Sequence, residues 1–107
     1  MTTTCKVKPG DCQIECYISI RSKGKECVFI DITSTCERVT AFARELFNLE
    51  MREIIAPVHK NHIWRTAGLK GCHPSCPVPL AVIKGVEIEC EMAIPKTLTI
   101  EFERIRQ

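Results

Sequence analysis

The sequence has neither a long apolar run nor a block of like charges, and each absence excludes a class of partner. Its longest apolar stretches, such as residues 77–83, are far shorter than the roughly 20 residues of a membrane-spanning helix. The 15 basic and 13 acidic residues are scattered along the chain and give a formal net charge of +2. We therefore predict a protein with no membrane and no nucleic-acid partner, and an unknown protein partner stays open.

Several functional motifs are also missing. The first residues lack the charged and apolar regions of a secretion signal, which predicts a cytoplasmic protein. There is no glycine-rich phosphate loop and no nucleophile-elbow serine, so no enzyme class is indicated. A length of 107 residues, with 45% hydrophobic and 26% charged residues, predicts a single globular domain over residues 1–107.

Cysteine is the residue type that the sequence has in excess, with eight in 107 residues. Cys16 and Cys90 fall on apolar faces of predicted elements, as small hydrophobic residues do. In a reducing cytoplasm, free thiols, metal ligands or a catalytic cysteine are more plausible than structural disulfides.

Alternating apolar residues predict three strands in the first third of the chain, at residues 4–8, 12–21 and 28–32. A three-residue loop at Lys23-Gly24-Lys25 would set Ile20 opposite Val28 and give both strands an apolar row on the same face. A further alternating segment, residues 97–104, predicts a strand that closes the chain with Leu98, Ile100 and Phe102 inward.

Helices are predicted between these strands. Ser34 and Glu37 have capping-box spacing before an apolar stripe, which predicts a helix over residues 35–49. Asn61 is placed to cap a short helix over residues 62–67 that ends at Gly68 and buries Ile63 and Trp64. Pro77 suits the first turn of a last helix, although residues 86–94 also alternate and leave a strand as the alternative.

Strands followed by helices and a final strand predict an α+β fold. We expect a two-layer sandwich, with a mainly antiparallel sheet of about four strands and two or three helices on one face. Each predicted strand has only one apolar side, as a sheet covered on one face requires.

Cys36 and Cys76 are the most informative cysteines because each lies at the start of a predicted helix. Unpaired N–H groups and the positive end of the helix dipole there stabilise a thiolate, which predicts a lowered thiol pKa. The alternative is that Cys36 simply packs in the core beneath the helix.

Cys12 follows the Pro9-Gly10-Asp11 turn and can lie at the same end of the domain as the two helix starts. Cys12, Cys36 and Cys76, with Cys72 or His73 as the fourth ligand, would form a set suited to zinc or an iron-sulfur cluster. No Cys-x-x-Cys spacing supports a zinc ribbon. Only one of Cys12 and Cys16 can join the set if both lie on one regular strand, where they would be roughly 13 Å apart.

The remaining candidates have simpler explanations. Cys27 and Cys5 are interpreted as bystanders, and His59 and His62 as a solvated surface. If the protein is instead a thiol enzyme, sulfur carrier or redox protein, Cys76 is the reactive residue and Cys36 or Cys72 resolves it. A third reading is an interaction module with no bound metal.

Four short motifs together resemble a family of small uncharacterised cysteine-containing proteins of anaerobic prokaryotes. The motifs are Pro9-Gly10-x-Cys12, Ser34-x-Cys36-Glu37, His73-x-x-Cys76-Pro77-Val78-Pro79 and Ala93-Ile94-Pro95-Lys96. The resemblance covers nearly the whole chain, and it groups Cys12, Cys36, His73 and Cys76 as one set without implying their task.

The segment Cys76-Pro77-Val78-Pro79 also resembles the Cys-Pro-x-Pro helix start of sulfur-carrier proteins of the TusA type. In that family the cysteine carries a persulfide, and the motif follows the first strand, whereas here it lies in the last third of the chain. The resemblance implies a cysteine whose thiolate is stabilised by a helix start.

Overall fold

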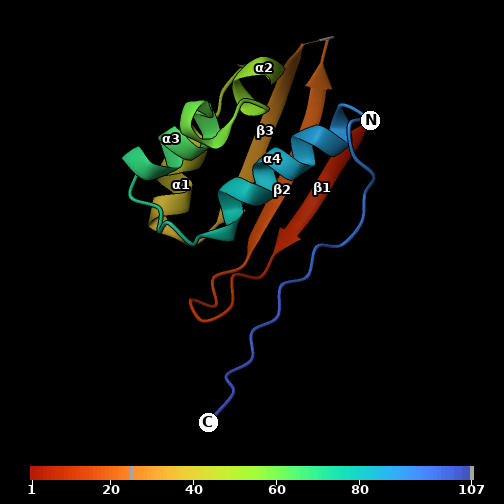
Figure 1. The fold of residues 1–107 in the computed structure, drawn as a ribbon. Coiled ribbons are helices and arrows are strands. Elements are labelled where there is room, and N and C mark those ends of the chain that lie inside the picture. The colour runs from red at the N-terminus through yellow and green to blue at the C-terminus, as the bar shows by residue number, and fades with distance from the viewer. Residues whose placement is uncertain (25, 107) are drawn as a thin grey trace.

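The computed structural model describes residues 1–24 and 26–106 as a two-layer α+β domain (Figure 1). An antiparallel sheet has the strand order β1-β2-β3-β4, and all helices cover one of its faces. The elements in chain order are β1 (Thr2–Val7), β2 (Cys16–Lys23), β3 (Cys27–Ser34), α1 (Glu37–Arg44), β4 (Leu49–Glu50), α2 (Met51–Ile54), the 3₁₀ helix η1 (Val58–Lys60), α3 (His62–Leu69) and α4 (Pro77–Glu89). The predicted fold class is confirmed.

The core lies between the apolar side of the sheet and the helices. Cys16, Ile18 and Ile20 of β2 are buried, as the alternation predicted, and α4 packs across β1 and β2 while α1 packs on β3. Gly85 allows the close approach of α4 to β2, because a Cβ at this position would overlap the Ile20 side chain. The largest fully buried side chains come from both layers: Phe42, Ile18, Ile20, Ile54 and Ile63.

The predicted register of the β2–β3 hairpin is wrong by two residues. Ile20 pairs with Ile30 instead of Val28, and the last pair is Lys23 with Cys27. Gly24 adopts φ +78, so the chain leaves β2 one residue later than predicted. The buried row is preserved because a shift of two keeps every side chain on its face. Lys25, the third residue of the predicted loop, lies outside the described residues.

The first helix is shorter than predicted at both ends. Cys36 is its N-cap residue, and the Ser34 hydroxyl accepts a hydrogen bond from the Cys36 N–H, so the predicted Ser34–Glu37 capping box does not form. After Arg44 the chain turns, and Asn48 at φ 51 directs it into the two-residue strand β4. Leu49 is still buried, but from β4 instead of from the helix.

The later helices largely agree with the sequence. Asn61 caps α3 as predicted, and Ile63 is fully buried while Trp64 is only partly so. The helix extends to Leu69, one residue past the predicted stop at Gly68. Pro77 occupies the first turn of α4, which continues to Glu89, so the alternative strand over residues 86–94 is wrong.

The predicted strand over residues 97–104 is also wrong. Within the described chain this segment is extended but has no strand partner, and its apolar side chains are exposed. The exposed fractions of Leu98, Ile100 and Phe102 are 60%, 63% and 93%. The fourth strand of the sheet is therefore β4, next to β3, and β1 is left as an open edge.

Candidate functional site

Three chain segments that carry predicted ligands meet at one end of the domain. In Figure 1 the connection from β1 to β2, the start of α1 and the start of α4 all lie at the lower end of the molecule. This arrangement follows from the topology, because β3 runs toward that end before α1 begins and the chain returns there between α3 and α4.

Cys12 lies in an exposed turn and not in a strand. Gly10 adopts φ 90, its carbonyl accepts a hydrogen bond from the N–H of Gln13 at 3.0 Å, and β2 begins only at Cys16. The predicted separation of roughly 13 Å between Cys12 and Cys16 assumed a regular strand. Cys12 instead precedes the strand, so strand geometry does not keep Cys12 and Cys16 apart.

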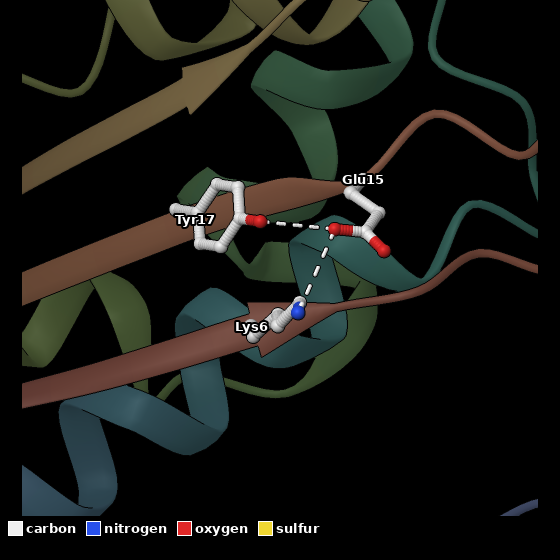
Figure 2. Close-up of polar contacts among 3 residues, drawn as sticks. All are labelled: Lys6, Glu15 and Tyr17. Atoms are coloured by element: carbon white, nitrogen blue, oxygen red, sulfur yellow. Dashed lines mark hydrogen bonds and ion pairs between the residues drawn. The ribbon is translucent and has the colours of Figure 1, made fainter.

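Glu15 ties the end of this turn to the sheet (Figure 2). One oxygen of its carboxylate accepts a hydrogen bond from the Tyr17 hydroxyl at 2.9 Å and lies 3.7 Å from Lys6 Nζ. The Lys6 ammonium is also 5.7 Å from the centre of the Tyr17 ring. Such exposed contacts contribute little stability, at most about 1 kcal/mol each.

Cys36 occupies the N-cap position of α1 with extended backbone angles, φ −75 and ψ 120. Its side chain makes no capping hydrogen bond, and its backbone oxygen accepts hydrogen bonds from the N–H and the hydroxyl of Thr40. The Cys36 side chain is half-buried against the core, and its sulfur does not cap the backbone N–H groups of α1. It is therefore free to contact another group at this end.

Cys72 and Cys76 belong to the tight loop before α4. The Cys72 N–H donates to the Ala67 oxygen and the Cys76 N–H donates to the His73 oxygen, each at 3.0 Å. The Cys72 sulfur lies 3.8 Å from the backbone oxygen of Arg38 in the first turn of α1. This contact joins the loop before α4 to the start of α1, where Cys36 is located.

The pKa of the Cys76 thiol is raised above its ordinary value, which overturns the predicted lowering. Burial is the main cause, and negative charge on Cys36 and Cys12 adds to the rise. The Val78 N–H, in the first turn of α4, opposes the rise, although the Cys76 side chain makes no full capping hydrogen bond. The helix start does stabilise the thiolate, but burial and neighbouring thiols outweigh it.

The pKa values of Cys72 and Cys16 are both raised by negative charge on Cys76 and Cys36, in addition to burial. Burial raises the pKa of the Cys72 thiol, Cys76 and Cys36 raise it further, and only the Arg38 guanidinium lowers it. Burial also raises the pKa of Cys16 to about 11, with contributions from Cys76, Cys5 and Cys36. These effects identify a group of neighbouring thiols, which we call the cysteine cluster: Cys12, Cys16, Cys36, Cys72 and Cys76, with Cys5 beside Cys16.

Sequence reasoning missed two of these neighbours. Cys16 is fully buried on the inner side of β2, and Cys5 is half-buried on β1, where burial raises its pKa. The signal was available in the alternation, since both positions point inward on adjacent strands near the end where the helices start. Cys16, which is fully buried, packs beneath the other members of the cluster, and the half-buried Cys5 lies beside it.

The other candidate ligands are farther from this group. His73 is exposed, and it contributes its backbone oxygen to the loop. His62 contacts the hydroxyl of Thr66 on its own helix. Cys90 caps the far end of α4, and Cys27 begins β3 at the opposite end of that strand from Cys36. Cys27 and Cys90 are therefore natural controls for the cluster.

Within residues 1–24 and 26–106, no three His, Cys, Asp or Glu side chains are already positioned as ligands of a single metal ion. The same part of the chain contains no helix with both the length and the apolar character needed to cross a bilayer. All eight thiols are free.

The chain belongs to a family of unknown function, DUF6951, whose model matches residues 3–102. The match includes the whole cysteine cluster and most of the extended segment after α4. No match was found among the curated proteins or among the solved structures.

Proposed function

We propose that this protein binds a metal ion or an iron-sulfur cluster through the cysteine cluster. The ligands in this proposal are Cys12, Cys36 and Cys76, with Cys72 as the fourth. The observation that carries it is the convergence of four cysteines from three separate segments at one end of the fold, close enough that negative charge on Cys36 raises the pKa of Cys72 and Cys76 and negative charge on Cys12 raises that of Cys76.

The chemistry of this donor set suits a soft or borderline cation. Zinc binds four thiolates in a tetrahedron at about 2.3 Å, and iron-sulfur clusters are also held by cysteine thiolates. In the metal-free protein each thiolate would repel its neighbours, which is part of why the pKa values of Cys72 and Cys76 are raised. A bound cation would remove that repulsion and hold the thiols in their deprotonated form.

Cys72 is a better fourth ligand than His73, an alternative that the sequence left open. Cys72 is half-buried, contacts α1 through the Arg38 oxygen and has its pKa raised by burial and by negative charge on Cys76 and Cys36, whereas His73 is exposed. The Cys12 turn and the loop before α4 would supply the movement that brings the sulfurs into coordination, since α1 and α4 are packed on the sheet.

The test is elemental analysis and visible absorption of protein isolated without oxygen. We expect near-stoichiometric zinc or iron, and we expect Cys36→Ser and Cys76→Ser each to lose it. Cys27→Ser and Cys90→Ser should retain it, because both residues lie away from the cluster. A folded protein that carries no metal, and takes up none after reduction and incubation with zinc or ferrous iron and sulfide, would refute the proposal.

A second candidate is a thiol-based sulfur carrier or redox protein, with Cys76 as the reactive residue and Cys36 or Cys72 resolving it. It is favoured by the closeness of Cys72 and Cys76 in one short loop, where negative charge on Cys76 raises the pKa of Cys72. The raised pKa of Cys76 counts against a nucleophile active at neutral pH. Mass spectrometry of the isolated protein distinguishes this candidate, since it requires an added sulfur atom on Cys76 or a disulfide from Cys76 to Cys36 or Cys72.

A further inference from the structure

The extended segment after α4 lies along a groove that it does not fill. A groove of about 740 Å³ separates this segment from β1 and α4, and its walls include Val7 on β1, Leu80 and Ile88 on α4, and Leu98 and Phe102 on the segment. Figure 1 shows the segment leaving the end of α4 beside the N-terminus and then running in the same direction as β1. The segment is thus already aligned with the open edge of the sheet.

The two sides of this groove carry complementary features: the edge of a sheet on one side and exposed apolar side chains on the other. Among the residues that the structure describes, the edge strand β1 has a row of backbone N–H and C=O groups with no ladder partner, which is a template for another strand. Across the groove, Leu98, Ile100 and Phe102 expose 60% or more of their surface to solvent. Burying these side chains against β1 and α4 would be favourable because it removes apolar surface from water.

Side-chain chemistry specifies one register for a parallel pairing. If Leu98 is placed beside Thr3, then Ile100 falls beside Cys5 and Phe102 beside Val7, all on the inner face of β1. Residues on one face of neighbouring strands at the same level are in contact.

The outer face agrees with the same register. It sets Glu101 beside Lys6 and Glu103 beside Lys8, so that both acidic residues of the segment meet basic residues, one on β1 and one directly after it. A shift of two residues either way would lose one of these opposite-charge pairs, and a shift of one would turn the apolar residues outward.

We propose that residues 97–103 dock in this groove as a fifth strand, parallel to β1 of the same chain. The family match, which continues through Phe102, is consistent with a segment that belongs to the domain. Ser75, Pro77 and Gly10 form the end of the groove next to the cysteine cluster, so docking of Phe102 there would also cover one side of the cluster. The inference is independent of whether the cysteines bind a metal.

Disulfide trapping in the full chain tests both the register and the partner. Cys5 is a native thiol on β1, and Ile100→Cys would place a second thiol beside it at a spacing that adjacent strands can bridge. Thr99→Cys is the matched control, because the docked strand would turn that side chain to the outer face. After mild oxidation, peptide mapping should find positions 5 and 100 joined within one chain in the first variant and no bond to position 5 in the control.

A charge exchange gives an independent readout by hydrogen exchange. We expect Glu103→Lys to lower the protection of the amides of residues 97–103 by about threefold, and Lys8→Glu combined with Glu103→Lys to restore it. Unprotected amides over residues 97–103 in the unaltered chain, or equal trapping of both cysteine variants, would overturn the proposal. Trapping that joins two chains would also overturn it, because the groove would then hold the segment of a second copy.

Discussion

The Cys72 sulfur lies 3.8 Å from the backbone oxygen of Arg38, so the loop before α4 rests on the first turn of α1. The same loop approaches the Arg38 side chain at Gly71, where a Cβ would be 3.9 Å from Arg38 Cδ. Arg38 therefore presents a positive charge to a thiol that burial and two neighbouring cysteines hold in its neutral form. Its guanidinium lowers the pKa of Cys72.

Removing the Arg38 charge should make Cys72 less reactive. In Arg38→Met the pKa of Cys72 should rise further, because burial, Cys76 and Cys36 would act without opposition. Alkylation of Cys72 at a fixed pH, followed by mass spectrometry of the peptides, should then be slower than in the unaltered protein. Arg44→Met, at the exposed far end of α1, is the control and should leave the rate unchanged. Equal rates in all three proteins would contradict this role of Arg38.

Metal binding to the cluster should release protons and should strengthen as pH rises. The raised pKa values of Cys72 and Cys76 mean that both thiols are protonated near neutral pH in the metal-free protein, whereas a metal takes the thiolate. Zinc titrations by calorimetry in buffers of different ionisation enthalpy would measure the protons released. Heats that do not depend on the buffer would show that the ligands are not protonated thiols.

The sequence was sufficient to predict those strands and helix starts that depend only on residues close to one another along the chain. Alternation in β2 and β3 identified the buried row, and the capping position of Asn61 identified the start of α3. The register of the hairpin was not accessible in this way, because it depends on which residue takes the left-handed conformation, and that residue is Gly24 directly after Lys23. Alternation alone also could not show that residues 97–104 lack a hydrogen-bonded partner.

For the candidate site, the sequence identified the segments better than their chemistry. The helix-start positions of Cys36 and Cys76 were predicted correctly, as was their convergence with the Cys12 turn at one end. The direction of the Cys76 pKa shift was predicted wrongly, because it depends on how deeply the sulfur is buried and on which thiols surround it. Burial and neighbours of this kind are properties of the folded chain that no local pattern contains.

Asn61 should be among the most important polar residues for stability. Its side-chain oxygen accepts hydrogen bonds from the N–H groups of Ile63 and Trp64, and its amide group donates to the oxygens of Ile54 and Ala56. Asn61→Ala would remove the cap of α3 and leave these buried groups unpaired, at a cost of about 2–4 kcal/mol in the free energy of unfolding. Chemical denaturation would measure it. Lys60→Ala, at the exposed neighbouring position, should cost little, and a similar small loss in Asn61→Ala would refute this assignment.

Glu89 should make the stability of the domain depend on acid pH. Its carboxylate, on the inner side of α4, is buried, and burial alone would raise its pKa. Hydrogen bonds from the Thr3 hydroxyl at 2.8 Å and the Ser22 N–H at 3.0 Å outweigh burial, so that the pKa is lowered from its ordinary value of 4.5.

A carboxyl group whose pKa is lower in the folded state stabilises the fold above its ordinary pKa, and that stability is lost as pH falls through the folded value. The free energy of unfolding should therefore decline below about pH 4.5, the ordinary pKa of this group. In Glu89→Gln this part of the decline should disappear, and stability at neutral pH should fall by about 1–3 kcal/mol because one of the two buried accepting oxygens is replaced by an NH₂ group that cannot accept a hydrogen bond. Glu87→Gln, on the more exposed side of the same helix, is the matched control. If both variants kept the pH profile of the unaltered protein, the stabilising role of the Glu89 carboxylate would be disproved.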